Sequence, residues 1–437
     1  MSQSVADHAA APAARAMPSE SAAAPGYRAV LAALDGSDRS DRALAEALAL
    51  ATAFGARLAA AHIYAARLHD LRFRQMEGGL PEPYREDERL GEQRAVHNEL
   101  IERGLRLISD SYLDAAASAC AARGIAFTPL SLEGKNYRAL LDEANSGRHD
   151  LVVLGANGLG ASADGELGTV CERVARRAAI DCLIVKEPQR ALAEGALLVA
   201  LDGSAQSWGA LRCALALARH LRAPLHAVSA YDPHFHYTAF RRLNSVLSDE
   251  ARALFRFEAQ QRLHEEIIDG GLARIYEGHL AVAESMAREH GVPIQTRLLE
   301  GKPCVAIARH VRELRPALLM VGRLGVHADA GLDIGGNAER LLRAVDCAVL
   351  LGARAHRPPA ELLAEATIGW TAQAEQRLAR VPEFARPMAR LAILRFAQER
   401  DHTIVTGDLV LEAVNALCPH LRHAAPASAR PAGESDR

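Results

Sequence analysis

Three glycines and a threonine form the part of the chain best suited to bind an anion. Gly155, Gly158 and Gly168 are spaced Gly-x2-Gly-x9-Gly, and Thr169 follows directly. Because glycine has no Cβ, successive backbone N–H groups can point into one concavity and approach phosphate oxygens closely. A helix predicted to begin near Gly168 adds free N–H groups and the positive end of its dipole, and the Thr169 hydroxyl is a further donor. The spacing predicts a phosphate-binding loop.

One carboxylate is placed to complete this site. Asp35 ends a short apolar strand predicted over 29–34, whereas the glycine loop follows the fourth predicted strand. In an open parallel sheet, ligands bind beyond the carboxyl ends of the strands at the point where the strand order reverses. Asp35 would then hold ribose hydroxyls or a phosphate-bound Mg²⁺. The loop is neither a dehydrogenase fingerprint, which follows a first strand, nor a Walker A loop, which closes on Gly-Lys-Ser/Thr.

The same pattern occurs a second time, 167 residues later, which indicates a duplicated domain. The matched residues of the second copy are Asp202, Gly322, Gly325, Gly335 and Gly336. Gly336 stands where the first copy has Thr169, so the second site keeps its backbone donors but lacks one hydroxyl. Losing one neutral hydrogen bond costs about 0.5–1.5 kcal/mol, so weaker binding is expected there. Asn337 could compensate, because its amide is a donor.

Each copy is predicted to alternate strands and helices, which indicates a parallel sheet with helices on both faces. The first domain is expected over 27–190 and the second over 194–354. The strands of the first copy are predicted at 29–34, 58–64, 125–132, 151–154 and 183–185. The last strand of each copy (182–185 and 347–350) is short, apolar and uncharged. Such sheet edges need a partner, so the two copies are expected to pair through them.

The aspartate at the first strand end, with Gly-x2-Gly-x9-Gly-Ser/Thr after the fourth strand, resembles the ATP-binding branch of the universal stress protein family. This resemblance implies a Rossmann-like fold with two tandem open five-stranded sheets, ordered 3-2-1-4-5. It implies ATP and Mg²⁺ as cofactors, with Asp35 near the ribose or metal and the glycines and Thr169 around the phosphates. The backbone near Ile63 would face adenine. It also implies that the two copies form an intramolecular pseudo-dimer through their fifth strands.

A separate helical module of three helices is predicted over 360–420. Apolar residues recur at helical spacing from Trp370 to Val381 and from Met388 to Ala397, and Thr406 caps a third helix. This segment is similar to the C-terminal helical module of light-independent protochlorophyllide reductase B subunits, which implies the fold and not that reaction. An amphipathic helical cap is the alternative. The module is expected to dock on the nucleotide domains or on a protein partner.

Bulk composition argues against several classes of partner. The formal net charge is -3, which predicts no nucleic-acid binding. No segment approaches the roughly 20 apolar residues of a membrane span. Seven cysteines without a CxxC pair suit a reducing cytoplasm and suggest small buried side chains. Residues 1–26 and 421–437 are predicted to be disordered tails.

Histidines and lysines raise two weaker possibilities. A histidine pair occurs in register in both copies, at His69, His97, His236 and His264. Imidazoles bind Zn²⁺ or haem, but no carboxylate or cysteine completes a familiar spacing, so structural or surface roles are favoured. The loop lysines Lys135 and Lys302 could reach a phosphate, although an exposed loop lysine needs no such role.

These patterns predict a cytoplasmic ATP-binding stress or regulatory protein with no dedicated catalytic apparatus. One alternative is a phosphoryl- or adenylyl-transferring enzyme of the same fold, for which no nucleophile–base pair is evident. Another is a partner-docking adaptor whose nucleotide sites are vestigial. Homodimerisation is left open.

Overall fold

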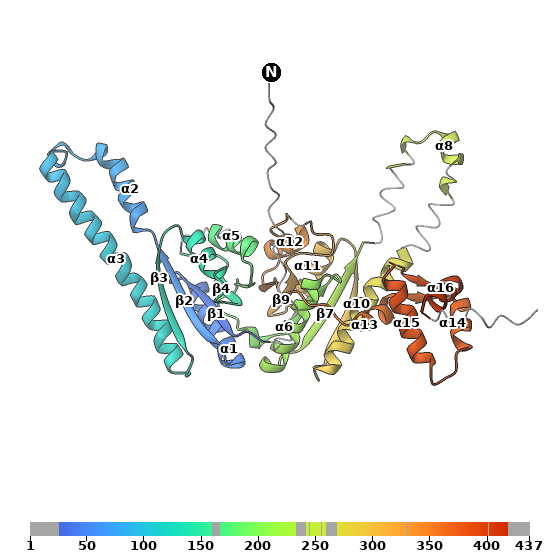
Figure 1. Cartoon of the computed structure of the whole chain (residues 1–437). Coiled ribbons are helices and arrows are strands. Elements are labelled where there is room, and N and C mark those ends of the chain that lie inside the picture. Colours follow the sequence, from blue (N-terminus) through green and yellow to red (C-terminus); the bar gives the residue numbers. More distant parts are fainter. Residues whose placement is uncertain are drawn as a thin grey trace, which may run out of the picture.

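The computed structural model describes residues 26–159, 167–232, 242–243, 245–254, 256–258, 269–329, 331–400 and 402–417. The two predicted tails therefore lie outside the described residues, apart from Gly26. Two repeats of strands and helices lie side by side, and a helical module follows at one end (Figure 1).

The first repeat contains five parallel strands and alternating helices, as the apolar pattern predicts. Its strands run within one or two residues of most predicted bounds, because runs of buried aliphatic residues specify them. The elements are β1 (Ala29–Leu34), α1 (Asp38–Phe54), β2 (Arg57–Tyr64), α2 (Ala66–Met76), η1 (Glu77–Gly79), η2 (Glu82–Tyr84), α3 (Asp87–Ala121), β3 (Phe127–Glu133), α4 (Asn136–Ala144), β4 (Leu151–Gly155), α5 (Thr169–Arg177) and β5 (Asp181–Val185).

The second repeat has the same order of strands after a short 3-10 turn. The elements are η3 (Leu192–Glu194), β6 (Leu197–Leu201), α6 (Ala205–Leu221), β7 (Leu225–Tyr231), α8 (Asp249–Leu254), α10 (Asp269–Glu289), β8 (Ile294–Glu300), α11 (Pro303–Leu314), β9 (Leu318–Gly322), α12 (Gly336–Ala344) and β10 (Ala348–Gly352).

The two repeats share one ten-stranded sheet, with the order β3-β2-β1-β4-β5-β10-β9-β6-β7-β8. Each half has the predicted order 3-2-1-4-5. Where two five-stranded sheets were expected, the structure has one continuous sheet, because β5 and β10 pair antiparallel and join the halves, with Leu183 opposite Leu350. All other pairings in the large sheet are parallel. Pairing the two apolar edges leaves neither one exposed.

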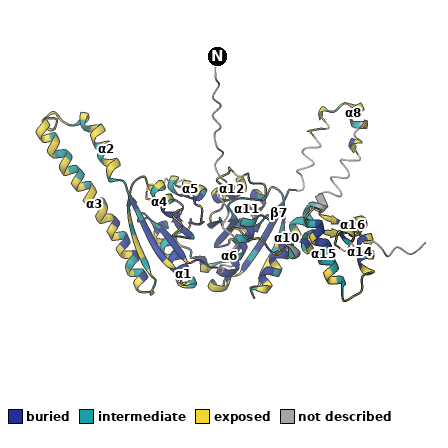
Figure 2. Ribbon diagram, viewed as in Figure 1, coloured by how far each residue is buried: buried dark blue, intermediate teal, exposed yellow. Residues whose placement is uncertain are grey.

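Two apolar layers sandwich the sheet (Figure 2). Helices α1, α3, α6 and α10 cover one face, and α4, α5, α11 and α12 cover the other. The central strands are buried on both faces: every residue of β5 and β10 is buried. Each layer contains residues of both repeats, so the two halves are held together by a continuous core as well as by strand pairing.

Polar contacts reinforce the junction of the two repeats. Helices α5 and α12 exchange reciprocal ion pairs, Arg176 with Glu339 and Arg343 with Glu172, the latter at 2.6 Å. These pairs connect equivalent residues in opposite order, as expected for a pseudo-twofold axis. On the same side, the Lys186 ammonium donates to the backbone oxygen of Leu342, and burial lowers the pKa of this lysine.

A helical arm projects from the first repeat (Figure 1). It consists of α2 and the outer part of α3, which pack against each other and leave most of their residues exposed (Figure 2). Arg94 donates two hydrogen bonds of 2.6 Å to Glu77 and ties α3 to the turn after α2. The arm thus projects from the β3 edge of the sheet, and α2 packs mainly against α3.

The C-terminal module has one helix more than predicted. It contains α13 (Ala360–Thr367), α14 (Ala372–Ala379), α15 (Arg386–Gln398) and α16 (Gly407–Leu417), with a two-stranded parallel sheet of β11 (Gly369–Trp370) and β12 (Ile404–Val405). Trp370 lies in β11 and not in a helix, and Met388 is 70% exposed and not in the apolar core. The predicted cap is confirmed: Thr406 Oγ1 accepts the Leu409 N–H at 3.2 Å.

Helix α13 fastens the module to the second repeat. Its residues Leu362, Leu363 and Ala366 pack against the apolar layer that contains α10. The closest approach is at Gly278 of α10, where a Cβ would lie 2.5 Å from the backbone oxygen of Ala366. Only glycine allows the two backbones to come this close.

Replacing Gly278 with alanine is expected to loosen this contact. The added methyl group overpacks the interface, which typically costs about 1–3 kcal/mol of unfolding free energy. Limited proteolysis should then cleave the chain near residue 358 faster, and thermal unfolding should begin earlier. The neighbouring exposed residue gives the control, since Glu277→Ala should change stability by less than about 0.5 kcal/mol. Equal behaviour of the two variants would contradict the close packing of α13 on α10.

Candidate functional site

The predicted residues of the first repeat come together in one cavity. Strand β1 lies between β2 and β4, so the strand order reverses there. A cavity of about 640 Å³ opens at this point, at the carboxyl ends of the strands. The predicted residues that line it are Asp35, Ile63, Gly155, Gly158, Gly168 and Thr169. A cavity of this size lies within the usual range of about 300–1,000 Å³ for small-molecule sites.

Close backbone packing explains the glycines of the loop. A Cβ at Gly158 would lie 2.1 Å from Oδ2 of Asp35, and a Cβ at Gly168 would lie 3.1 Å from Cα of Asn157. A Cβ at Gly155 would lie 3.0 Å from Cβ of Arg39 in α1. Side chains at these positions would fill the space between the loop and the strand ends. The three glycines therefore keep the loop folded closely around the cavity.

The Asp35 carboxylate is held by its own turn. Its Oδ1 atom accepts the Ser37 N–H at 3.0 Å and the Ser37 hydroxyl at 2.7 Å. The turn depends on Gly36, whose φ is +76°. With Oδ1 fixed in this way, Oδ2 faces Gly158 and the loop. One carboxylate oxygen is thus oriented toward the cavity, where it could accept from ribose hydroxyls or coordinate a cation.

Helix α5 presents its N-terminus to the same cavity. Gly168 is its N-cap, and among the described residues no side chain caps it. Its first three residues, Thr169, Val170 and Cys171, all line the cavity. The N–H groups of a first helical turn have no partner within the helix, and the dipole there is positive. This end of the cavity suits a phosphate group.

Several polar residues of the first cavity escaped the sequence analysis: His62, Asn136 and Asn157. Burial lowers the pKa of His62, while the nearby Asp35 carboxylate partly opposes this shift. A neutral imidazole is therefore expected, and its Nδ1 atom has no hydrogen-bond partner among the described residues. One indication in the sequence that His62 belongs to the site is that it directly precedes Ile63, near the end of β2.

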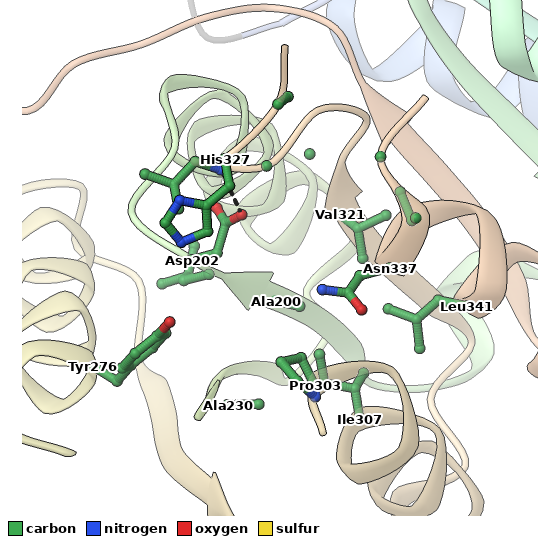
Figure 3. Close-up of a pocket in the computed structure, with 18 of the residues that line it drawn as sticks. Ala200, Asp202, Ala230, Tyr276, Pro303, Ile307, Val321, His327, Asn337 and Leu341 are labelled. Atoms are coloured by element: carbon green, nitrogen blue, oxygen red, sulfur yellow. Dashed lines mark hydrogen bonds between the residues drawn. The ribbon is translucent and has the colours of Figure 1, made fainter. Parts of the chain in front are cut away.

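The second repeat forms an equivalent cavity of about 290 Å³ (Figure 3). The predicted residues that line it are Asp202, Gly322, Gly325, Gly335 and Gly336. Asn337, which the sequence singled out as a donor, lines it as well. Helix α12 begins at Gly336, and its N-cap Gly335 supports no side-chain cap among the described residues. Residues 160–166 of the first loop and Ala330 of the second lie outside the described part of the chain.

The second site differs in detail from the first. Oδ1 of Asp202 accepts the Ser204 N–H at 3.0 Å, as in the first repeat, but Oδ2 also accepts the Val326 N–H at 3.2 Å. Tyr276 and His327 add side chains that the sequence analysis did not assign to a site. Asp202 therefore already bonds to the loop of its own site, and the second cavity is smaller than the first and has Tyr276 and His327 in its lining.

Other candidate ligands lie away from the two cavities. Neither Lys135 nor Lys302 is among the described residues that line these two cavities, and the Lys135 ammonium lies 5.5 Å from the ring centre of Tyr137. His69 is exposed, and His97 stacks on Phe73 at 4.1 Å. His236 and His264 lie outside the described residues. Within the described part, no group of three or more His, Cys, Asp or Glu side chains could hold a metal.

Six cysteines are described, and all are free and buried, as predicted for small apolar side chains. Burial raises the pKa of Cys171 to about 12, so this thiol at the first cavity is protonated and a poor nucleophile. Among the described residues, no helix is both long and apolar enough to span a bilayer.

Several known proteins are similar to parts of this chain. A curated protein of Thermus aquaticus, named "Universal stress protein in QAH/OAS sulfhydrylase 3'region", is 31% identical over 160 residues, 37% of this chain and 99% of that protein. A solved structure of a functionally unknown protein from Pseudomonas aeruginosa PAO1 is 15% identical, with a TM-score of 0.47 over 78% of this chain and 96% of that one. A universal stress protein solved in complex with cAMP is 26% identical, with a TM-score of 0.24 over 37% and 97% of the two chains.

Family comparisons cover most of the sequence. The family described as the proto-chlorophyllide reductase 57 kD subunit matches residues 370–413, within the C-terminal module. The universal stress protein family matches twice, over residues 26–186 and 195–351, which are the two repeats. The chain is therefore a tandem member of the universal stress protein family.

Proposed function

We propose that this protein binds ATP with Mg²⁺ in its first repeat and acts as a regulatory or stress-response protein, without a dedicated catalytic apparatus. The observation that carries the proposal is the first cavity, where all six residues predicted for that repeat line one space at the reversal of strand order. An uncapped helix N-terminus at one end and the Asp35 carboxylate at the strand end suit the phosphates and the ribose or metal.

The metal would depend on the nucleotide. Mg²⁺ is commonly held by one or two carboxylates together with substrate phosphates and water, and not by a cage made of protein alone. Among the described residues that line the first cavity, Asp35 is the one acidic side chain. A single carboxylate therefore fits a metal that arrives with the triphosphate. This arrangement supports the binding of a nucleotide together with its metal.

Titration calorimetry on the full chain tests the assignment of Asp35. Asp35→Ala is expected to weaken ATP–Mg²⁺ binding at the first site, because the ribose or metal loses its carboxylate. Asp38→Ala is a suitable control, since Asp38 lies in the first turn of α1 and does not line the cavity. If Asp35→Ala binds ATP–Mg²⁺ as tightly as the wild type, Asp35 does not contact the ligand. ATP turnover near the ~10 s⁻¹ of typical enzymes would instead favour the enzyme alternative.

We further propose that the two repeats work as an intramolecular pseudo-dimer with unequal sites. The antiparallel pairing of β5 with β10 and the reciprocal ion pairs between α5 and α12 support this arrangement. Thr169 and Gly336 begin the two helices that face the cavities, so the missing hydroxyl falls at the phosphate end of the second site. The second site is expected to bind ATP more weakly than the first.

Restoring the hydroxyl should strengthen the second site. No atom lies within 4 Å of a Cβ built at Gly336, so the position has open space for the start of a side chain. In a chain whose first site is blocked by Gly168→Val, Gly336→Thr is expected to tighten ATP binding by roughly 2- to 10-fold, the equivalent of one hydrogen bond. Gly336→Ala is the matched control, because it adds a Cβ without a hydroxyl. Equal affinities of the two variants would contradict a role for the hydroxyl.

A further inference from the structure

The second cavity replaces polar positions of the first repeat with aromatic, cyclic or smaller residues. The residues Ser109, Asn136 and Thr169 correspond in register to Tyr276, Pro303 and Gly336. Ser109 is fully buried, and its hydroxyl lies 2.9 Å from that of Ser131, so it contributes nothing to the first cavity. Tyr276, in contrast, lines the second cavity. The two sites thus differ most in the side chains around a ligand and least in their glycines.

Neighbouring aromatic residues hold the Tyr276 ring in place. The ring stacks on Tyr231 with centres 6.2 Å apart and planes 29° apart, and His279 meets it edge-on at 5.5 Å. Tyr231 is itself anchored, since its hydroxyl donates to Glu300 at 3.1 Å. Burial raises the pKa of Tyr276, and the Asp202 carboxylate raises it further, so the phenol stays neutral. A fixed, uncharged aromatic side chain is a suitable surface for a planar ring.

The other walls near Tyr276 are apolar. In Figure 3, Tyr276 and Pro303 lie on either side of Ala230. Ala230 occupies the position of Ile63, where the base of a nucleotide is expected, and Ile307 of α11 lies next to Pro303 in the lining. A slot between an aromatic ring and aliphatic side chains favours a flat, weakly polar group. This end of the second cavity is better suited to a base than its counterpart in the first.

The phosphate end of the second cavity is poorer in contacts. Gly336 supplies no hydroxyl, and the Asp202 Oδ2 atom already accepts the Val326 N–H. A metal-bound triphosphate would have to compete with this hydrogen bond. The whole cavity is also smaller, about 290 Å³ against about 640 Å³. Both differences disfavour the binding of a triphosphate group.

From these differences we infer that the second repeat binds a nucleoside or a nucleoside monophosphate, with its base against Tyr276. The first repeat would take ATP, as proposed above, and the inference rests on that function only in assuming a nucleotide as ligand. Tyr276 then determines the specificity of the second site. The chain would respond to two nucleotides with different numbers of phosphates, one in each repeat.

Titration of the full chain with AMP, adenosine and ATP tests this inference. The background is Gly168→Val, which blocks the first site. AMP and adenosine are expected to bind this chain more tightly than ATP. Tyr276→Ser, which introduces the residue of the first repeat, should weaken AMP by about tenfold, since stacking of a base on an aromatic ring contributes on this order. Tyr276→Phe keeps the ring and should retain most of the affinity.

The outcomes separate this inference from the proposed function. In a Gly168→Val chain that has lost the first-site ATP adduct, tighter binding of ATP than of AMP would overturn the inference, whatever the variants of Tyr276 do. If Tyr276→Ser binds AMP as tightly as the parent Gly168→Val chain and has the same melting temperature, Tyr276 does not contact the ligand. If Tyr276→Ser unfolds, the comparison of AMP with ATP in the parent still decides. If the first site of the wild-type chain does not bind ATP, the proposed function is overturned and the inference about the second site is not.

Discussion

Asp181→Ala is expected to lower the free energy of unfolding by about 3–5 kcal/mol. This carboxylate is 2% exposed and lies at the start of β5, where the two repeats meet. It accepts four hydrogen bonds: from the Tyr27 hydroxyl at 3.0 Å, the Ala353 N–H at 2.8 Å, and the backbone N–H and Nε of Arg354 at 3.1 and 2.9 Å.

Removing the carboxylate takes the acceptor away from the Ala353 N–H, the Arg354 N–H and the Arg354 Nε. The Tyr27 hydroxyl keeps a contact with Cys213 Sγ at 2.9 Å, and Nη1 of Arg354 keeps its hydrogen bond to the Gly26 oxygen. The Arg354 guanidinium also stacks over the Tyr27 ring, 4.1 Å from its centre, so it cannot turn to solvent without breaking this contact. Breaking a buried ion pair from one side typically costs about 3–5 kcal/mol, because the remaining charge has lost its partner. Asp181 thus connects β5 with Tyr27, which lies just before β1, and with the segment after β10. Its loss should therefore weaken the junction of the repeats.

The second repeat provides a matched control. Asp346 precedes Cys347 just as Asp181 precedes Cys182, yet Asp346 is exposed. Asp346→Ala should change stability by less than about 0.5 kcal/mol. Urea denaturation of the wild type and both variants measures the difference. Similar destabilisation by the two substitutions would show that the buried cluster around Asp181 does not stabilise the junction.

Gly168→Val is expected to lower the affinity of the first site for ATP by at least about 100-fold. A Cβ at this position already lies 3.1 Å from Cα of Asn157, and the branched side chain would push the loop away from the N-terminus of α5. Hydrogen bonds to charged groups contribute about 1.5–3 kcal/mol each, so losing two of them to the phosphates suffices for this effect.

A glycine elsewhere in the chain controls for the general effect of adding a side chain. Gly104 lies within α3, and no atom lies within 4 Å of a Cβ built there. Gly104→Val should leave ATP affinity unchanged. A calorimetric titration of both variants, with circular dichroism to verify the fold, measures the contrast. Comparable ATP affinity in the two folded variants would show that the glycine loop does not hold the phosphates.

The sequence predicted the position of those candidate site residues that lie at strand ends and in the glycine loop. Asp35 and Gly158 are far apart in the chain, yet an aspartate at one strand end and glycines after another sufficed to predict that they meet. The reason is that parallel strands bring their carboxyl ends to one edge, and glycine marks close backbone approach. The internal repeat then transferred the prediction to Asp202 and Gly325.

Side chains that reach the site from helices were harder to predict. Tyr276 follows the apolar spacing of α10 and looks like a core residue, and only the fold shows that it faces a cavity. His62 is likewise one polar residue in an apolar strand. In both cases the direction of a side chain depends on tertiary packing, which periodicity alone does not specify.

The remaining differences between prediction and structure concern the joining of the two sheets and the helical module. The apolar edges of β5 and β10 indicated a need for pairing, and the structure differs from the prediction only in that their pairing gives one sheet of ten strands in place of two sheets of five. Helix α13 was missed because it is only eight residues long and follows two prolines. Met388, near the start of α15, continues a helical apolar stripe, yet it is exposed and is not part of the small core of the module.

The central claim is that the first repeat holds ATP, and native mass spectrometry of the purified full chain tests it most directly. After incubation with ATP and Mg²⁺, the wild-type chain should carry a mass increase that corresponds to bound ATP. The Gly168→Val chain should lose this first-site adduct, whereas Gly104→Val should retain it. The absence of any ATP adduct on the folded wild-type chain, or its full retention in Gly168→Val, would contradict the account.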